Sequence, residues 1–178
     1  HNYEARLRCK NGSIRHVLIS SNVLWENGEF IHTRCFTRDV TERKQAEEAL
    51  RESEERFRML VDAAPLGIYL VDADFRISQV NPIALPIFGN IPDLIGRDFD
   101  EVIHILWTKE YADEVVRLFR HTLHTGESYV TPERIEERRD RSVIEVYEWR
   151  IDRISLPDGR YAVVCYFRDI SAQMQARW

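Results

Sequence analysis

Two related stretches decide the fold of this chain. The first reads CFTRDVTERKQA at residues 35–46, and the second reads CYFRDISAQMQA at residues 165–176. The cysteine, the Arg-Asp pair and the closing Gln-Ala recur in register, and Val/Ile and Thr/Ser are close matches. An internal repeat with a spacing of about 130 residues is typical of two copies of one domain rather than of a solenoid.

The repeat predicts how the chain is organised. We expect residues 1–40 to be the C-terminal half of one domain and residues 57–171 to be a complete second copy. Residues 41–56 would link the two, and residues 172–178 would start a helix that leads to an output domain. Because the first residue is His rather than Met, we also expect the chain to be a fragment.

The first part contains three apolar runs, at residues 3–9, 14–25 and 30–38. Asn11-Gly12 and Asn27-Gly28 separate these runs. Asn-Gly between apolar runs favours a type I′ hairpin turn, in which both central residues have positive φ. We therefore predict a three-strand antiparallel meander. Its apolar side chains would need cover from the linker helix or from a neighbouring chain, and they include Val17, Ile19, Val23, Trp25 and Phe30.

Residues 41–60 predict a charged helix, because they contain neither Gly nor Pro. Asp39 is the expected N-cap, with Glu42 as its capping-box partner. Ion pairs at i,i+4 contribute about 0.2–0.5 kcal/mol each, and the expected pairs are Glu47–Arg51, Glu52–Arg56 and Glu54–Arg58. A coiled-coil seam with 4-3-4-3 spacing would comprise Ala46, Leu50, Ser53, Phe57 and Leu60. Two interpretations stay open: a solvated connector, or a dimeric helix that joins two like domains.

The second copy predicts an α+β fold. Residues 68–71 and 75–80 form the first two strands, and frequent Pro and Gly limit residues 82–108 to short helical turns. A helix with one apolar side follows at residues 111–124, and Gly126 ends it. Three more strands are expected at residues 127–138, 143–156 and 160–169. This order favours one antiparallel sheet with the helices on one face.

Short motifs punctuate this order of elements. They are SEERF at residues 53–57, VNP at 80–82, LIG at 94–96, HTGE at 124–127, RDIS at 168–171 and RDVT at 38–41. Their order and spacing resemble the PAS domain family of sensor modules, and residues 41–57 are similar to linkers between tandem PAS domains in bacterial sensor histidine kinases and diguanylate cyclases. The resemblance implies a five-stranded antiparallel sheet with helices on one face, preceded by a three-strand PAS remnant and a connecting helix.

The resemblance also implies a function. It implies a sensory module that couples the state of a ligand or partner to an output domain, a histidine kinase or cyclase beyond Trp178, through dimeric helices. A homodimer through the linker helix and the sheet is expected. Gly-x-Gly-x-x-Gly, phosphate-loop and Gly-x-Ser-x-Gly motifs are absent, so no catalysis is expected in these residues. A passive dimerisation or spacer module and a protein-docking module, both without a small-molecule ligand, are the alternatives.

Both repeated stretches place an acidic residue and a hydroxyl where a strand becomes a helix. These side chains can satisfy free N–H groups at the helix start and meet the positive end of its dipole. A small shift of the sheet would then tilt or rotate the helix. The expected signal-exit residues are Arg38, Asp39, Thr41, Arg168, Asp169 and Ser171.

A pocket between sheet and helices would be apolar. Its candidate lining residues are Tyr69, Val71, Ile77, Leu85, Phe88, Val102, Ile103, Phe119, Leu123, Tyr147, Trp149 and Val163. These side chains could hold a small apolar ligand. They could equally well fill the core with no ligand present, as aromatic and aliphatic residues usually do.

No cofactor is predicted from the pocket sequence. Flavin-binding relatives carry a reactive cysteine in the helical middle, whereas residues 82–125 contain none. Haem-binding relatives use a histidine on the long helix, and the candidates for that minor alternative are His104, His121 and His124. No His-x-Glu or His-x-x-x-His pair offers a second metal ligand, so no metal site is predicted.

Composition limits the remaining function classes. The chain has 178 residues and a formal net charge of −5, which does not favour nucleic acid as a partner. No apolar run approaches the roughly 20 residues that span a bilayer, although an upstream membrane anchor stays open. Cys9, Cys35 and Cys165 form no Cys-x-x-Cys motif. We therefore expect a cytoplasmic location.

Overall fold

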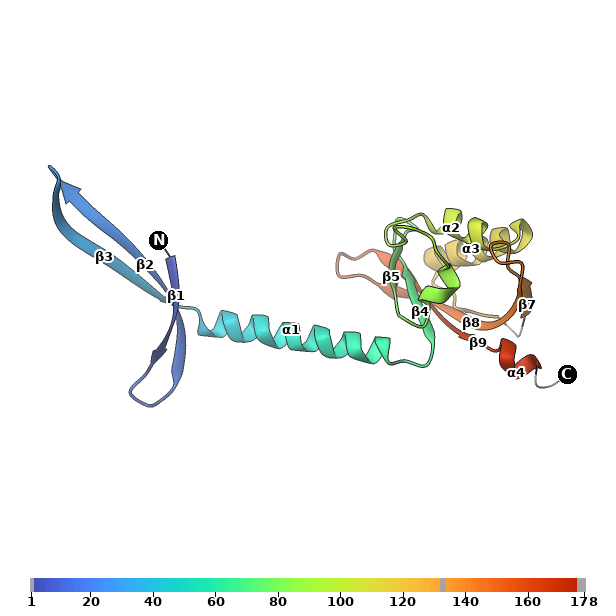
Figure 1. The fold of residues 1–178 in the computed structure, drawn as a ribbon, viewed down its shortest axis with the longest axis horizontal. Coiled ribbons are helices and arrows are strands. Elements are labelled where there is room, and N and C mark those ends of the chain that lie inside the picture. Colours follow the sequence, from blue (N-terminus) through green and yellow to red (C-terminus); the bar gives the residue numbers. More distant parts are fainter. Residues whose placement is uncertain (1, 132–133, 176–178) are drawn as a thin grey trace. The chain divides into compact units, whose positions relative to one another are not determined.

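The computed structural model describes residues 2–131 and 134–175. The chain divides into two compact units, residues 1–58 and residues 59–178. Each unit contains one antiparallel sheet, and helix α1 (Thr41–Asp62) begins in the first unit and ends in the second. Figure 1 shows the elements in chain order.

The first unit is the predicted meander. Its strands are β1 (Asn2–Arg8), β2 (Ile14–Glu26) and β3 (Glu29–Asp39), with β2 in the centre. Asn27 and Gly28 both have positive φ, 50° and 81°, as the type I′ turn requires.

The first hairpin differs from the prediction. Gly12 has positive φ but Asn11 does not, so the type I′ turn expected there is wrong. The chain instead makes a longer turn, closed by bonds from the N–H of Cys9 to the carbonyl of Ser13 and from the N–H of Gly12 to the carbonyl of Cys9. A single left-handed residue suffices in this longer turn, and Gly12 supplies it.

Apolar side chains of the meander remain largely exposed. Val17 is buried and Ile19 is half-buried, but Trp25 keeps 61% of its surface exposed and Val23 and Phe30 are similarly open. The linker helix therefore does not cover these three side chains, and their cover by a neighbouring chain stays a prediction. The rings of Trp25 and Phe30 meet edge to face, with centroids 5.7 Å apart.

Helix α1 is longer than the predicted linker and starts differently. It extends to Asp62 because the first helix breaker after it is Pro65. It begins at Thr41, and the carbonyl of Val40 accepts the first helical bond from Lys44, so Val40 holds the N-cap position and Asp39 precedes it. The carboxylate of Asp39 accepts from Thr41 instead.

The ion pairs of α1 also follow a different pattern. Arg51 binds Glu48 and Glu55, both at 2.6 Å, rather than Glu47. Glu47 lies 3.5 Å from Arg43. Glu47 at i−4 is as well placed for Arg51 as Glu55 at i+4, but Glu47 pairs with Arg43 in the preceding turn.

The second unit is an α+β domain. Its strand order is β5–β4–β9–β8–β6, and β7 also pairs with β8. Helices α2 and α3 lie on one side of the sheet, as predicted (Figure 1). The elements are β4 (Gly67–Val71), β5 (Ile77–Val80), the short 3-10 helix η1 (Leu85–Phe88), α2 (Phe99–Leu106), α3 (Lys109–Thr125), β6 (Tyr129–Val130), β7 (Arg134–Glu137), β8 (Ile144–Ser155), β9 (Tyr161–Asp169) and α4 (Ser171–Gln175).

Two strands of this sheet depart from the predicted limits. The strand expected at residues 127–138 forms two pieces, β6 and β7, and residues 132–133 lie outside the described residues. Strand β5 begins at Ile77 instead of Phe75, because Phe75 has a φ of 61° and belongs to the turn. Asp72 organises this turn by accepting from the N–H groups of Asp74 and Arg76, both at 2.9 Å.

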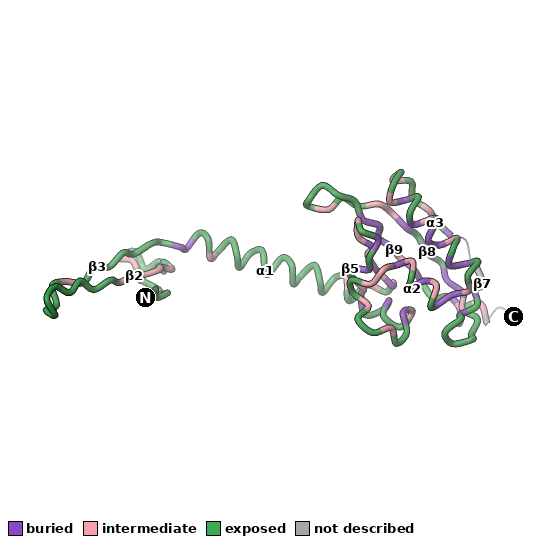
Figure 2. Tube along the Cα trace, turned by 90° about the horizontal axis from the view of Figure 1, so that it is seen from above, coloured by how far each residue is buried: buried purple, intermediate pink, exposed green. Residues whose placement is uncertain are grey.

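The core of the second unit lies between the sheet and the helices. On β8, Tyr147, Trp149 and Ile151 are buried, whereas Glu148 and Arg150 are exposed, as the alternation predicts. Figure 2 shows the buried residues of this unit gathered along the inner sides of its elements. Each fully buried large apolar side chain contributes about 1.5–3 kcal/mol, so this unit holds most of the burial energy of the chain.

Candidate functional site

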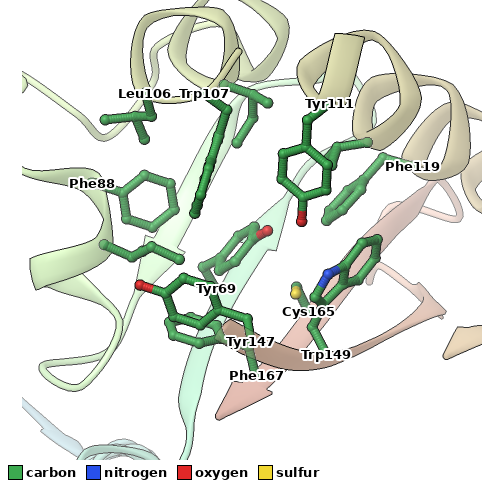
Figure 3. A pocket seen from close by; sticks show the side chains of 13 residues that line it. Tyr69, Phe88, Leu106, Trp107, Tyr111, Phe119, Tyr147, Trp149, Cys165 and Phe167 are labelled. Atoms are coloured by element: carbon green, nitrogen blue, oxygen red, sulfur yellow. The ribbon is translucent and has the colours of Figure 1, made fainter. Parts of the chain in front are cut away.

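A cavity of about 40 Å³ lies between the sheet of the second unit and its helices (Figure 3). Side chains from η1, α2, α3, β4, β8 and β9 form its wall. The volume suffices for about three water molecules or a comparably small organic molecule, since one water needs about 10–15 Å³ on this scale.

Half of the predicted pocket residues line this cavity. They are Tyr69, Phe88, Ile103, Phe119, Tyr147 and Trp149. Val71, Ile77, Val102 and Val163 are fully buried in the surrounding core but do not reach the cavity. Leu123 is half-buried at the edge of that core.

Leu85 was predicted to line the pocket, and this prediction is wrong. It is 50% exposed, whereas Ile87 and Phe88 of the same short helix line the cavity. The segment turns more tightly than an α-helix, so a small error in its phase places the wrong side chain inward.

The other cavity residues were not predicted. They are Ile87, Leu106, Trp107, Tyr111, Val115, Cys165 and Phe167. Two patterns in the sequence could have found four of them. Tyr111, Val115 and Phe119 follow one another at i,i+4 on α3, and Cys165 and Phe167 alternate with Val163 on β9.

Aromatic rings make up most of the wall. Tyr69 is stacked on Phe119 with centroids 6.0 Å apart and meets Phe88 edge-on at 5.1 Å. Tyr147 lies edge-on to Phe167 at 5.7 Å and to Trp107 at 5.8 Å. Such ring contacts each contribute about 0.5–1.5 kcal/mol of stabilisation beyond burial. They therefore hold the side chains of the wall in place.

A small polar group interrupts the apolar wall. The hydroxyl of Tyr69 interacts with the thiol of Cys165, and Figure 3 shows the hydroxyl of Tyr111 directed toward the same region. Burial raises the pKa of Tyr69 well above its usual value and the pKa of Cys165 to about 12. Both groups are therefore neutral at physiological pH, and the thiol is unreactive.

A buried ion cluster borders the cavity. Arg138 is fully buried, binds Asp140 through two parallel hydrogen bonds of 2.8 Å and lies 3.4 Å from Glu145. Its guanidinium group stacks on Trp107 at 4.7 Å from the ring centroid. Tyr147 donates its hydroxyl to Glu145 at 2.6 Å. Trp107 and Tyr147 thus touch the cavity on one side and this cluster on the other.

The three candidate haem-binding histidines lie elsewhere. His104 contacts the carbonyl of Asp100 and the carboxylate of Asp113, at 2.8 Å and 2.9 Å. His121 and His124 are exposed. None of the three lines the cavity, so their placement does not suit an axial ligand inside it. Within residues 2–131 and 134–175, no group of three or more His, Cys, Asp or Glu is arranged to hold a metal ion.

The strand-to-helix exit of the first unit is held by a set of hydrogen bonds. Asp39 Oδ1 accepts from the N–H of Thr41 at 2.9 Å, and Thr41 Oγ1 accepts from the N–H of His16 at 2.8 Å. Val40 donates its N–H to the carbonyl of His16, and its own carbonyl accepts from Lys44. Hydrogen bonding by Thr41 lowers the pKa of Asp39, so this carboxylate stays charged.

The exit of the second unit repeats this pattern. Asp169 Oδ1 accepts from the N–H of Ser171 at 2.9 Å, and Ser171 Oγ accepts from the N–H of Val146 at 2.9 Å. Ile170 donates to the carbonyl of Val146 and accepts from Met174. Every partner stands 130 residues after its counterpart in the first unit.

The two arginines of the exit motif play no part in these bonds. Arg38 and Arg168 are exposed on their strands. Arg168 instead lines a shallow groove on the outer face of the second sheet, together with Glu148, Arg150 and Tyr166.

Comparison with known families gives matches over most of the chain. The sequence model of a family described as "PAS fold" matches residues 61–175, and that of a family described as "PAS domain" matches residues 1–42. Among the helices of the described residues, none is both long enough and apolar enough to cross a membrane.

One curated relative is a much longer protein. "Probable diguanylate cyclase DgcE" of Escherichia coli (strain K12) is 31% identical over 104 residues. These residues cover 57% of this chain but only 9% of the relative.

Solved structures share the fold. The PAS domain of an HTR-like protein from Haloarcula marismortui matches with a TM-score of 0.54 and 26% identity, over 71% of this chain and 99% of that one. The Vibrio cholerae VqmA dimer matches with a TM-score of 0.53 and 18% identity, over 65% of this chain and 50% of that one. At that identity the second match supports the fold alone.

Proposed function

The chain belongs to the PAS domain family, and from that premise we propose that it couples the state of its core cavity to a downstream output domain. The family is one of regulatory sensors, and its fold brings a small cavity and a strand-to-helix exit into one domain. The proposal therefore assigns input to the cavity and output to α4, with no catalysis in these residues.

Backbone pairing supports a short path from cavity to exit. The ring of Tyr147 lines the cavity, and Tyr147 pairs with Asp169 across β8 and β9. The adjacent residue, Val146, donates its N–H to Ser171 at the start of α4. A ligand that displaced Tyr147 would thus act directly on groups that hold the first turn of α4.

The observation that carries the proposal is the repeated exit. Val17 pairs with Asp39 in the first unit as Tyr147 pairs with Asp169 in the second. The same capping bonds follow in both units. A capping bond in a single domain could serve stability alone. A complete set at two exits, each followed by a helix, favours a role in passing strand motion to helices.

We propose that the output passes through paired helices in a homodimer. The apolar members of the predicted seam are exposed on α1, with Phe57 at 67% and Leu60 at 68%. Ala46, Leu50 and Ser53 are exposed too. At 100° per residue the seam lies opposite the Arg51 ion cluster, which leaves one side of α1 apolar and available to a second α1.

The nature of the output is also a proposal. The relative from E. coli is a probable diguanylate cyclase, and this chain spans only 9% of its length. We propose that α4 leads to an output domain downstream of Trp178, either a diguanylate cyclase or a histidine kinase.

The coupling can be tested in a chimera in which the chain precedes a diguanylate cyclase domain. Val115→Phe would fill the cavity and imitate an occupied state. We expect it to change cyclase activity several-fold in the wild-type background but not in an Asp169→Ala background. Asp158→Ala is the matched control, because Asp158 contacts the N–H and the side chain of Arg160 in a surface turn away from α4. If Val115→Phe had the same effect in all three backgrounds, the proposed path through Asp169 would be wrong.

A second function remains a candidate because the cavity is small. At about 40 Å³ it is well below the roughly 300–1,000 Å³ of common ligand sites. This favours a dimerisation and spacer module with a filled core. Two results together would support that alternative. Mass spectrometry under native conditions would find no metabolite bound to the protein, and Val115→Phe would not change the cyclase activity of the chimera.

A further inference from the structure

The wall of the cavity restricts what it can bind, an inference that rests on the sensory function proposed above. We propose that the cavity takes a small uncharged molecule with an apolar body and a single hydroxyl or carbonyl group, of about three or four non-hydrogen atoms. Charge, polarity and volume each support one part of this description.

The absence of charge on the wall argues for an uncharged ligand. All lining residues are aromatic or aliphatic except Cys165, and the thiol and the Tyr69 hydroxyl are neutral. The charges of the neighbouring ion cluster do not line the cavity: Arg138 pairs with Asp140 and Glu145, and Glu145 also accepts from the hydroxyl of Tyr147. A charged ligand would lose its hydration without gaining a counter-charge.

The position of the polar groups argues for a single polar end. Figure 3 shows the hydroxyls of Tyr69 and Tyr111 and the thiol of Cys165 directed toward one region of the cavity, and Phe88 and Leu106 on another side. A phenol hydroxyl offers one donor and two acceptor positions. Tyr69 can therefore bond both Cys165 and the oxygen of a ligand.

The volume sets the size. A space of about 40 Å³ corresponds to about three waters, and an organic molecule with a similar number of heavy atoms would replace them. A larger ring system would require displacement of Phe119 or Trp149, which are packed against each other and against Tyr69 or Tyr129.

The experiment compares three probes of equal size that differ in charge. The indole N–H signal of Trp149 is followed by NMR in the 178-residue chain during titration with 1-propanol, acetate or propylammonium. We expect 1-propanol to give a saturable shift and both ions to bind at least about tenfold more weakly. No saturable shift with 1-propanol, or an equal shift with either ion, would overturn the proposal.

Variants separate binding in the cavity from effects of the solvent. Val115→Phe fills the cavity and should remove the saturable shift, whereas Val130→Phe adds the same ring at an exposed site and should preserve it. If Val115→Phe does not fold, Tyr69→Phe serves instead. Tyr69→Phe should weaken the binding of 1-propanol at least about tenfold. It should leave the binding of xenon unchanged, because xenon needs no polar partner. Binding that persists in Val115→Phe, or in Tyr69→Phe at full strength, would contradict the assignment.

These outcomes are independent of the coupling experiment. The NMR titration measures occupancy of the cavity and does not involve α4 or a cyclase. A negative titration with intact coupling through Asp169 would refute the ligand class alone. Saturable binding without coupling would refute the proposed signal path alone.

Discussion

At the scale of single residues, Arg138 is the most unusual feature of the second unit. A fully buried guanidinium group is held by Asp140, Glu145 and the face of Trp107. Burial raises the pKa of Asp140, but hydrogen bonding to Arg138 and the Arg138 charge lower it by more, so its pKa lies below the usual value. The cluster is stable because each charge has a partner.

Removal of Arg138 should therefore be costly. Arg138→Met leaves two carboxylates near a cavity wall, and we expect it to lower the free energy of unfolding by about 2–4 kcal/mol. Arg150→Met is the control, since the Arg150–Asp152 pair is half exposed and should be worth no more than about 1 kcal/mol. Urea unfolding at neutral pH measures both. Similar losses in the two variants would show that the Arg138 cluster is energetically ordinary.

The same cluster predicts a pH dependence. Because the pKa of Asp140 is lowered in the folded state, its contribution is present above the unfolded value of about 4 and is lost as pH falls through the folded pKa. The difference in stability between wild type and Arg138→Met should therefore narrow below about pH 4. A difference that stays constant with pH would mean that Asp140 is not the partner that matters.

At the scale of elements, His104 connects α2 to α3. Hydrogen bonding at the backbone of Asp100 and to the carboxylate of Asp113 raises the pKa of His104, and Lys109 shares the carboxylate of Asp113. A raised folded pKa means that the contact stabilises the protein below the unfolded value of about 6.5 and is lost as pH rises through the folded pKa.

Replacing His104 tests the direction of this pH dependence of stability. His104→Gln should lower stability by up to about 1 kcal/mol near pH 5.5 and by less near pH 8.5. His32→Gln, at a half-buried position of the first unit where the imidazole accepts from Arg34 instead of contacting a carboxylate, is the control. Urea unfolding at the two pH values gives the comparison. A loss that grows with pH would contradict the assigned pairing of His104 with Asp113.

Helix α1 is the element on which the proposed dimer depends. Leu50→Glu places a charge in the exposed apolar seam, and we expect it to weaken dimerisation at least about tenfold in sedimentation equilibrium. Gln45→Glu adds the same charge outside the seam and should leave the association constant unchanged. Equal association of both variants would place the dimer contact elsewhere.

At the scale of the whole molecule, burial is unevenly divided. The first unit buries few large apolar side chains, whereas the second has a continuous core. Hydrogen exchange at low protein concentration should therefore be at least about tenfold slower in β4, β8 and β9 than in β1–β3. Equal protection would mean that a second chain or another segment covers the meander.

Much of the architecture could be predicted from the sequence, whereas the cavity could only be predicted in part. Period-2 alternation predicted the inward residues of β8, and the Arg-Asp repeat predicted both exits, because these patterns are local. Trp107 could not be predicted, since its position depends on Arg138 far along the chain. Leu85 and Phe75 were misplaced because a tight helix and a left-handed residue change the direction of the chain within two or three positions.

The matching exits have one more consequence, which concerns the lengths that natural variants of this chain can have. Each exit fixes the rotational phase of the helix that follows it, because three hydrogen bonds orient its first turn. One residue inserted into α1 would rotate its apolar side by about 100°, whereas seven would bring it back to within about 20°. Insertions and deletions in α1 should therefore be tolerated in whole heptads and rejected otherwise.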